Sequence, residues 1–126
     1  MMKLFLKVQT KGLHSFGMDI IWDNALFDFV QHEDLGVFDQ LNCALADGGQ
    51  GKIILGAANL NQRHVSGEHE FVGMEFAWVD GATEEIVQFA VDNVSAKDMD
   101  GNDVPFKVLV KNYEPIEHTV IEFIWR

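Results

Sequence analysis

The chain has 126 residues, of which 20 are Asp or Glu and 9 are Lys or Arg, so its formal net charge at pH 7 is -11. A surface this negative repels nucleic-acid phosphates and anionic membrane headgroups, so we expect no nucleic acid and no membrane as a partner. Hydrophobic residues make up 48% of the sequence, too many for a disordered chain. A chain of this length buries enough apolar surface for a core, and we expect one globular domain over residues 1–126.

The start of the chain and its cysteine content bear on the compartment. Lys3 and Lys7 interrupt the apolar residues near the N-terminus, so no signal peptide is expected, and no run of 18 apolar residues predicts a membrane span. Cys43 is the single cysteine, and we expect its thiol to be buried and inert. An unpaired thiol is typical of reducing compartments. We therefore expect a soluble, cytoplasmic protein.

The first predicted elements are extended. Residues 3–10 alternate between apolar and polar side chains, which predicts a strand. Residues 18–30 fit either a hairpin that turns near Asp23 or a short helix. We favour extended structure, because Phe27 and Phe29 alternate with an acidic residue.

Residues 34–46 form the best candidate for a helix. Asp34 stands at the position of an N-cap, and two glycines at 48 and 49 supply a stop signal. Apolar side chains recur between them at spacings of three and four: Leu35, Phe38, Leu41 and Leu45. This spacing predicts one principal helix.

Extended segments follow the predicted helix. The turn residues at 98–103, with Asp98, Gly101 and Asn102, predict a tight turn between strands, and a calcium loop is the alternative for the same residues. The terminal segment, residues 118–126, has apolar side chains on both faces and predicts a central strand. The predicted strands cover residues 51–60, 71–79, 86–91, 104–110 and 118–126.

These elements predict the fold class. We expect an α+β domain with a largely antiparallel sheet of six to eight strands and one principal helix. The alternative is a β-sandwich or small β-barrel with one packed helix.

Acidic residues concentrate in two stretches that contain no Lys or Arg, residues 12–51 and 64–96. One interpretation is a solvated surface that keeps the domain soluble. The other is an acidic face that binds a basic protein or a cationic small molecule, with Trp22 able to hold a cation against its ring. The candidate binding residues are Asp19, Trp22, Asp23, Asp28, Glu68, Glu70 and Glu75.

Histidines and carboxylates also suggest a metal site. The candidate ligands are His64, His69, Glu75 and His118, whose nitrogen and oxygen atoms suit Zn, Ni, Mn or Fe. Gly67, His69, Glu75 and Gly81 resemble the first metal motif of the cupin barrels, with a phenylalanine where the second motif histidine belongs. The resemblance implies a metal-bearing barrel.

Three functional hypotheses follow. The leading one is a non-enzymatic binding or inhibitor-type domain with an acidic face, because no hydrolase elbow or phosphate loop occurs in the sequence. We expect no cofactor. The second is a small-ligand or metal-dependent enzyme on a barrel-like scaffold. The third is a structural module that forms a homodimer through surplus aromatic surface.

Overall fold

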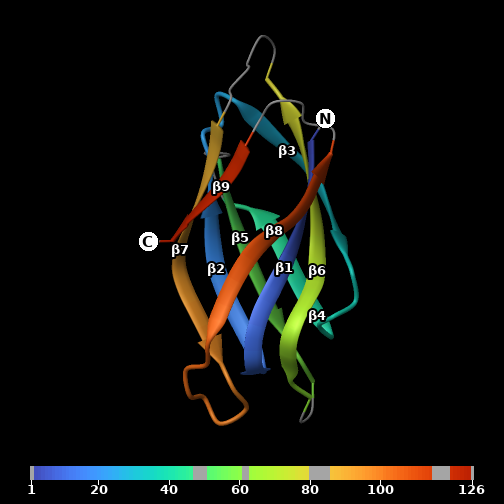
Figure 1. Cartoon of the computed structure of the whole chain (residues 1–126), viewed down its shortest axis with the longest axis vertical. Coiled ribbons are helices and arrows are strands. Elements are labelled where there is room, and N and C mark those ends of the chain that lie inside the picture. The colour runs from blue at the N-terminus through green and yellow to red at the C-terminus, as the bar shows by residue number, and fades with distance from the viewer. Residues whose placement is uncertain (1, 47–50, 61–62, 80–85, 115–119, 126) are drawn as a thin grey trace.

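The computed structural model describes residues 2–46, 51–60, 63–79, 86–114 and 120–125. Within these residues every regular element is a β-strand (Figure 1). In chain order the strands are β1 (Met2–Leu13), β2 (Ser15–Ile21), β3 (Phe27–Asp34), β4 (Gln40–Leu45), β5 (Lys52–Ala58), β6 (Val65–Trp78), β7 (Ile86–Lys97), β8 (Phe106–Glu114) and β9 (Val120–Trp125). The described residues include no helix, and hence none that could cross a bilayer.

The strands form two sheets. The four-stranded sheet has the order β3-β6-β1-β8, and the five-stranded sheet has the order β4-β5-β2-β7-β9. Apart from the parallel pair β7 and β9, the strand pairs of the described residues are antiparallel. The chain crosses repeatedly between the sheets, so strands that follow each other in sequence mostly lie in different layers (Figure 1). This arrangement is a β-sandwich.

The core lies between the two sheets and is rich in aromatic rings. Phe76 of β6 is fully buried and has four ring neighbours: Trp22 at 5.2 Å, Phe27 at 6.2 Å, Phe29 at 5.5 Å and Phe89 at 5.4 Å between centroids. Most of these contacts are edge-on or tilted, the geometry that aromatic quadrupoles favour. Both sheets contribute to this cluster, so it fixes how the two layers stack.

The predicted helix over residues 34–46 is wrong. Asp34 ends β3, and one carboxylate oxygen accepts the N–H of Gly36 at 2.9 Å, so Asp34 caps a turn. Gly36 has a φ of +79°, in the left-handed region, which a right-handed helix does not contain. Residues 40–45 then form β4, because Leu41 and Cys43 also fit the two-residue period of a strand. The spacing of the apolar residues alone does not distinguish the helical period from the two-residue period of a strand.

The α+β class is therefore wrong, since the described chain is all β. The alternative of a β-sandwich has the right layers, but its packed helix is absent from the described residues. The prediction of a central terminal strand is also wrong, because β9 lies at the edge of its sheet, next to β7. The strand predicted over residues 3–10 and the extended structure predicted over residues 18–30 are confirmed.

The predicted turn at residues 98–103 is confirmed. The Asp98 carboxylate accepts the N–H groups of Asp100 and Asn102, both at 2.9 Å, and Gly101 has a φ of +85°. The backbone hydrogen bond from Asn102, together with the one from Asp100, lowers the pKa of Asp98. Because this carboxylate already holds the turn together, the turn interpretation fits the residues better than a calcium loop.

Candidate functional site

The structure divides the predicted acidic residues between the two outer faces of the sandwich. Glu68, Glu70 and Glu75 of β6 stand opposite the outward residues of β1, on the four-stranded sheet. Asp28 lies on β3 of the same sheet and is exposed. Asp19 lies on β2 of the five-stranded sheet. The two acidic stretches therefore do not form one continuous face.

Trp22 and Asp23 sit at the turn between β2 and β3. Trp22 is only 5% exposed, and its indole N–H donates to the carbonyl of Phe27 at 3.0 Å. Asp23 is exposed, and its carboxylate accepts the N–H of Ala25 at 2.9 Å. Trp22 and Asp28 help to line a shallow cavity of about 300 Å³. Since the Trp22 ring packs edge-on against Phe76, its main role is in the core, and its cation binding stays a prediction.

The predicted metal ligands do not assemble among the described residues. His64 is exposed ahead of β6, and His69 donates through Nε2 to the carbonyl of Ser66 at 2.7 Å. Glu75 instead accepts a hydrogen bond from the Gln31 amide at 2.7 Å. No group of three or more His, Cys, Asp or Glu side chains in the described part of the chain is placed to hold a metal ion. His118 and Gly81 lie outside the described residues, and a two-sheet sandwich does not match the cupin-type barrel.

Cys43 has the environment that the sequence predicts. It lies on β4, is 7% exposed, and its Sγ is 4.0 Å from the sulfur of Met74. Burial raises the pKa of the Cys43 thiol to about 12. The thiol therefore stays protonated at neutral pH and is a poor nucleophile.

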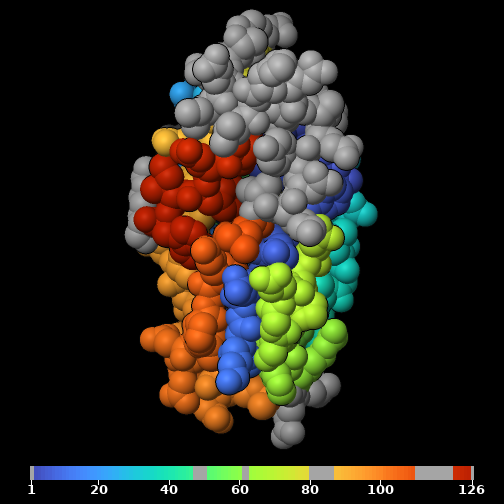
Figure 2. All heavy atoms as spheres, viewed as in Figure 1, coloured from blue at the N-terminus to red at the C-terminus, as the bar shows by residue number. Residues whose placement is uncertain are grey.

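The outer face of the four-stranded sheet is covered by charges that pair with each other. Lys3 Nζ lies 3.1 Å from Glu33 and 3.9 Å from Glu75, and Lys7 Nζ lies 3.0 Å from Glu68. The Lys3–Glu75 and Lys7–Glu68 pairs join the neighbouring strands β1 and β6, and the Lys3–Glu33 pair reaches from β1 across β6 to β3. Figure 2 shows this face, with β8, β1 and β6 side by side. Long paired side chains leave little apolar surface here for a partner.

The outer face of the five-stranded sheet has a different composition. Its outward positions carry mainly small or apolar side chains, and Ile54 and Ile124 are 47% and 40% exposed. A shallow cavity of about 260 Å³ lies over β4 and β5. We call this surface the five-stranded face. The strand registers place on it Ser15, Gly17, Asp19, Ile21, Gln40, Asn42, Ala44, Lys52, Ile54, Gly56, Ala58, Gln88, Ala90, Asp92, Ser95, Lys97, Glu122 and Ile124.

Two glycines stand side by side near the middle of this face. Gly17 of β2 pairs directly with Gly56 of β5. A Cβ added at Gly17 meets nothing within 4 Å, one added at Gly56 meets only the carbonyl of Phe16 at 3.4 Å, and neither glycine has a positive φ. Glycine inside a strand costs about 0.5–1 kcal/mol relative to alanine. Neither the backbone nor the packing within the chain requires glycine here, and strand glycines often mark the close approach of another backbone.

Two carboxylates lie next to the glycine pair. Asp19 of β2 is directly opposite Asp92 of β7. Lys52 Nζ is 3.4 Å from Asp19, whose carboxylate also accepts the Asn93 side-chain amide at 2.7 Å. Asn93 has a φ of 52° at a bulge in β7, and its backbone N–H donates to Asp92 at 2.9 Å. The two acids therefore place negative charge beside apolar surface.

Of the residues on this face, the sequence analysis named Asp19 as a candidate and did not name the glycines or Ile54. A signal for them was present in residues 52–58, where Ile54 lies between two buried apolar neighbours and breaks the alternation expected of a strand with one solvated face. A strand that is apolar on both sides needs either a second layer or a partner. The composition of β5 alone therefore indicates that something covers its outer side.

No family model matches the chain, and no curated protein matches its sequence. Solved structures do share its fold. The solution structure of CaCohA2 from Clostridium acetobutylicum matches with a TM-score of 0.63 and 18% identity, covering 73% of this chain and 64% of that one, so this chain spans just under two thirds of that neighbour. A non-cellulosomal cohesin from the archaeon Archaeoglobus fulgidus matches with a TM-score of 0.60 and 13% identity, over 97% of this chain and 74% of that one.

A third structure is the sixth cohesin of Acetivibrio cellulolyticus scaffoldin B in complex with a Cel5 dockerin variant. It matches with a TM-score of 0.63 and 8% identity, over 91% of this chain and 79% of that one. At such identities the likeness concerns the fold. This chain shares the β-sandwich of cohesin modules.

Proposed function

We propose that the chain is a non-enzymatic protein-binding domain whose partner docks on the five-stranded face. The observation that carries the proposal is the strip formed by Gly17, Gly56 and the exposed Ile54, which Asp19 and Lys52 border. The cohesin fold supports it, because the Acetivibrio cohesin was solved in complex with a dockerin. A partner with the role of a dockerin is therefore the first class to test.

The physical basis is the match between this face and the centre of a protein interface. Interface centres are depleted in charge and enriched in apolar contact. Burying apolar surface contributes roughly 25 cal/mol per Å², and the glycine pair lets a partner approach the sheet closely. The four-stranded face lacks these properties, because paired Lys and Glu side chains cover it.

We infer that the partner also carries a basic group. Asp19 and Asp92 lie opposite each other on the five-stranded face, while the described cation beside them is Lys52. A lysine or arginine of the partner that approaches Asp92 would pair with it and relieve the repulsion between the two acids. The proposed partner is therefore still basic, as the sequence suggested. Its basic group contacts one acidic pair and not a broad acidic face.

The experiment replaces one exposed apolar side chain on each sheet. Ile54 of β5 and Val30 of β3 are both 47% exposed, so Ile54→Asp and Val30→Asp are matched variants. The probe is the Cel5 dockerin together with a panel of other dockerin domains, measured by isothermal titration calorimetry. We expect Ile54→Asp to weaken binding by roughly a hundredfold, as for a central interface residue, and Val30→Asp to change it less than about twofold.

Two results would contradict the proposal. Equal affinity of wild type and Ile54→Asp would remove the five-stranded face from the interface. Absence of binding across the panel would remove a dockerin-type partner. A second copy of the chain is the competing occupant, and it predicts a dimer in analytical ultracentrifugation that Ile54→Asp dissociates.

A further inference from the structure

The strand β4 forms one border of the five-stranded face. It lies at the edge of its sheet, and β5 is its hydrogen-bonded neighbour in that sheet. It nevertheless contributes Gln40, Leu41 and Asn42 to the shallow cavity. An edge strand of six residues frays easily unless something fixes its ends. The partner surface therefore depends on what holds β4 in place.

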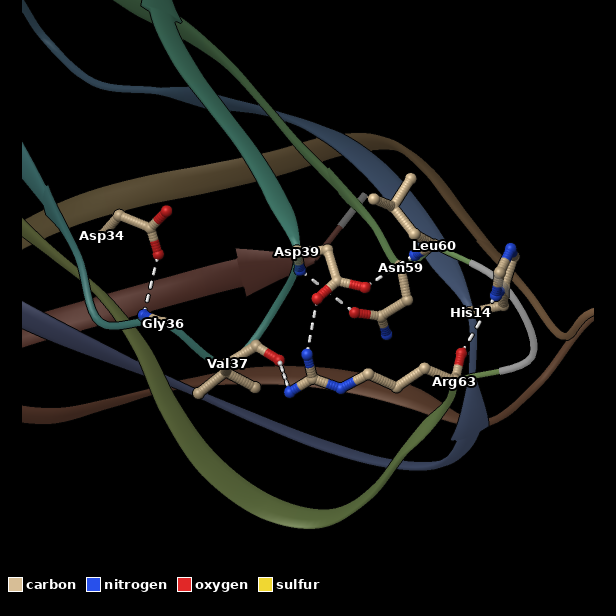
Figure 3. A network of polar contacts seen from close by, with 8 residues as sticks. All are labelled: His14, Asp34, Gly36, Val37, Asp39, Asn59, Leu60 and Arg63. Atoms are coloured by element: carbon tan, nitrogen blue, oxygen red, sulfur yellow. Dashed lines mark hydrogen bonds and ion pairs between the residues drawn. The ribbon is translucent and has the colours of Figure 1, made fainter.

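A polar network fixes the start of β4 (Figure 3). Asp39, the residue before β4, accepts the backbone N–H of Leu60 at 2.7 Å through Oδ2 and forms an ion pair with Arg63 through Oδ1. The backbone N–H of Asp39 donates to Asn59 Oδ1 at 3.2 Å. Arg63 also donates to the carbonyl of Val37 at 3.3 Å. Both oxygens of one carboxylate thus join the segment before β4 to the segment after β5.

The position of this network makes it a clamp. The last pair of the β4 and β5 ladder is Gln40 with Ala58, and the clamp lies immediately beyond it. Asn59 is 4% exposed, and its Nδ2 has no hydrogen-bond partner among the described residues. A buried unpaired donor is unfavourable. The contacts around Asp39, together with the hydrogen bond from the Asn59 backbone N–H to the His14 carbonyl at 2.9 Å, hold this corner together.

We propose that the Asp39 and Arg63 clamp is a positioning device for the five-stranded face, and that it acts on binding by keeping the edge strand β4 in register. The inference rests on the proposed function for its effect on affinity. Its effect on β4 is a property of the free protein. Arg63 and Asp39 affect affinity indirectly, by holding β4 in place, whereas β4 itself contacts the partner.

The first test uses the free protein and needs no partner. Hydrogen exchange of the β4 amides is compared in wild type, Arg63→Ala and Arg63→Lys. Lys7→Ala serves as the control, because it removes one cation and one ion pair from the opposite face. We expect Arg63→Ala to speed exchange in β4 by roughly three- to tenfold, since a partly exposed charge-assisted contact is lost. Arg63→Lys keeps the charge and is expected to fall between wild type and Arg63→Ala.

The second test measures dockerin affinity of the same variants at a temperature where all are folded. We expect the affinity loss to follow the exchange rates, with partial rescue in Arg63→Lys and no change in Lys7→Ala. Unchanged exchange in Arg63→Ala overturns the clamp, whatever binds the face. Faster exchange with full affinity overturns its role in binding, while the Ile54→Asp result still decides the proposed function. Lost affinity with unchanged exchange assigns Arg63 to direct contact and also overturns the positioning role.

Discussion

The two outer faces of the sandwich present different side chains to solvent. On the four-stranded face, lysines of β1 and glutamates of β3 and β6 pair within 3.0–3.9 Å. On the five-stranded face, the strands expose glycine, alanine and isoleucine, with Asp19 and Asp92 left opposite each other. On the four-stranded face these charged side chains have partners within the chain. The five-stranded face leaves apolar side chains exposed and sets two carboxylates opposite each other, with Lys52 and Asn93 in contact with Asp19. Exposed apolar surface costs stability, and a partner that covers this face would bury it.

This contrast makes a general prediction about substitutions. Changes that improve the five-stranded face as a free surface should stabilise the fold and weaken binding. Changes on the four-stranded face should alter stability alone.

The largest effect is expected for valine in place of the strand glycines. Gly17→Val fills open space on the five-stranded face, so it should raise the free energy of unfolding by about 0.5–1 kcal/mol. The added methyl groups should weaken partner binding by roughly ten- to a hundredfold, the equivalent of an overpacked contact of about 1–3 kcal/mol. Urea denaturation and calorimetric titration measure the two effects.

The matched variant on the other face is Gly73→Val. A Cβ at Gly73 already lies 3.4 Å from Phe5 and Lys3 side-chain atoms, so the larger side chain should lower stability by about 1 kcal/mol. Its affinity should equal that of wild type. If both valine variants changed stability and affinity in the same direction, the difference between the faces would not hold.

A smaller effect is expected at the acidic pair. Asp92→Asn removes the like charge opposite Asp19, so the fold should gain a few tenths of a kcal/mol. Affinity for a basic partner should fall by roughly three- to tenfold and become less dependent on salt. Titrations at several salt concentrations measure this, with Glu68→Gln as the control on the four-stranded face. An unchanged salt dependence in Asp92→Asn would remove the basic group from the proposed partner.

Much of the strand structure followed from the sequence, because alternation directly reports which side of a strand is buried. Leu4, Leu6 and Val8 alternate with polar residues and face the core. The helix error had a local cause: Leu41 and Leu45 fit both periods, and the positive φ of Gly36 cannot be read from its neighbours. In such segments the pairing partner, here β5, decides the structure.

The candidate site was less predictable for a different reason. Charge along the chain does not show which face a residue lies on, because a strand alternates its side chains between two faces and the crossovers send consecutive strands to different sheets. Acidic residues that are close in sequence therefore separate in space. The pairing of Gly17 with Gly56 joins β2 to β5 across two intervening strands in the chain, and no local pattern predicts such a pair.

The smallest effect is expected on the four-stranded face. Lys3 lies near Glu33 and Glu75 and over the Phe5 ring at 5.0 Å, with its side chain 32% exposed. Lys3→Met keeps the apolar stem and removes the charge, so stability should fall by less than about 1 kcal/mol. At 1 M salt the screening length is about 3 Å, and the difference from wild type in urea denaturation should shrink towards zero. Partner affinity should stay unchanged at every salt concentration, because these charges are already satisfied within the chain. A clear loss of affinity in Lys3→Met would place the partner on the four-stranded face and reverse the assignment of the two faces.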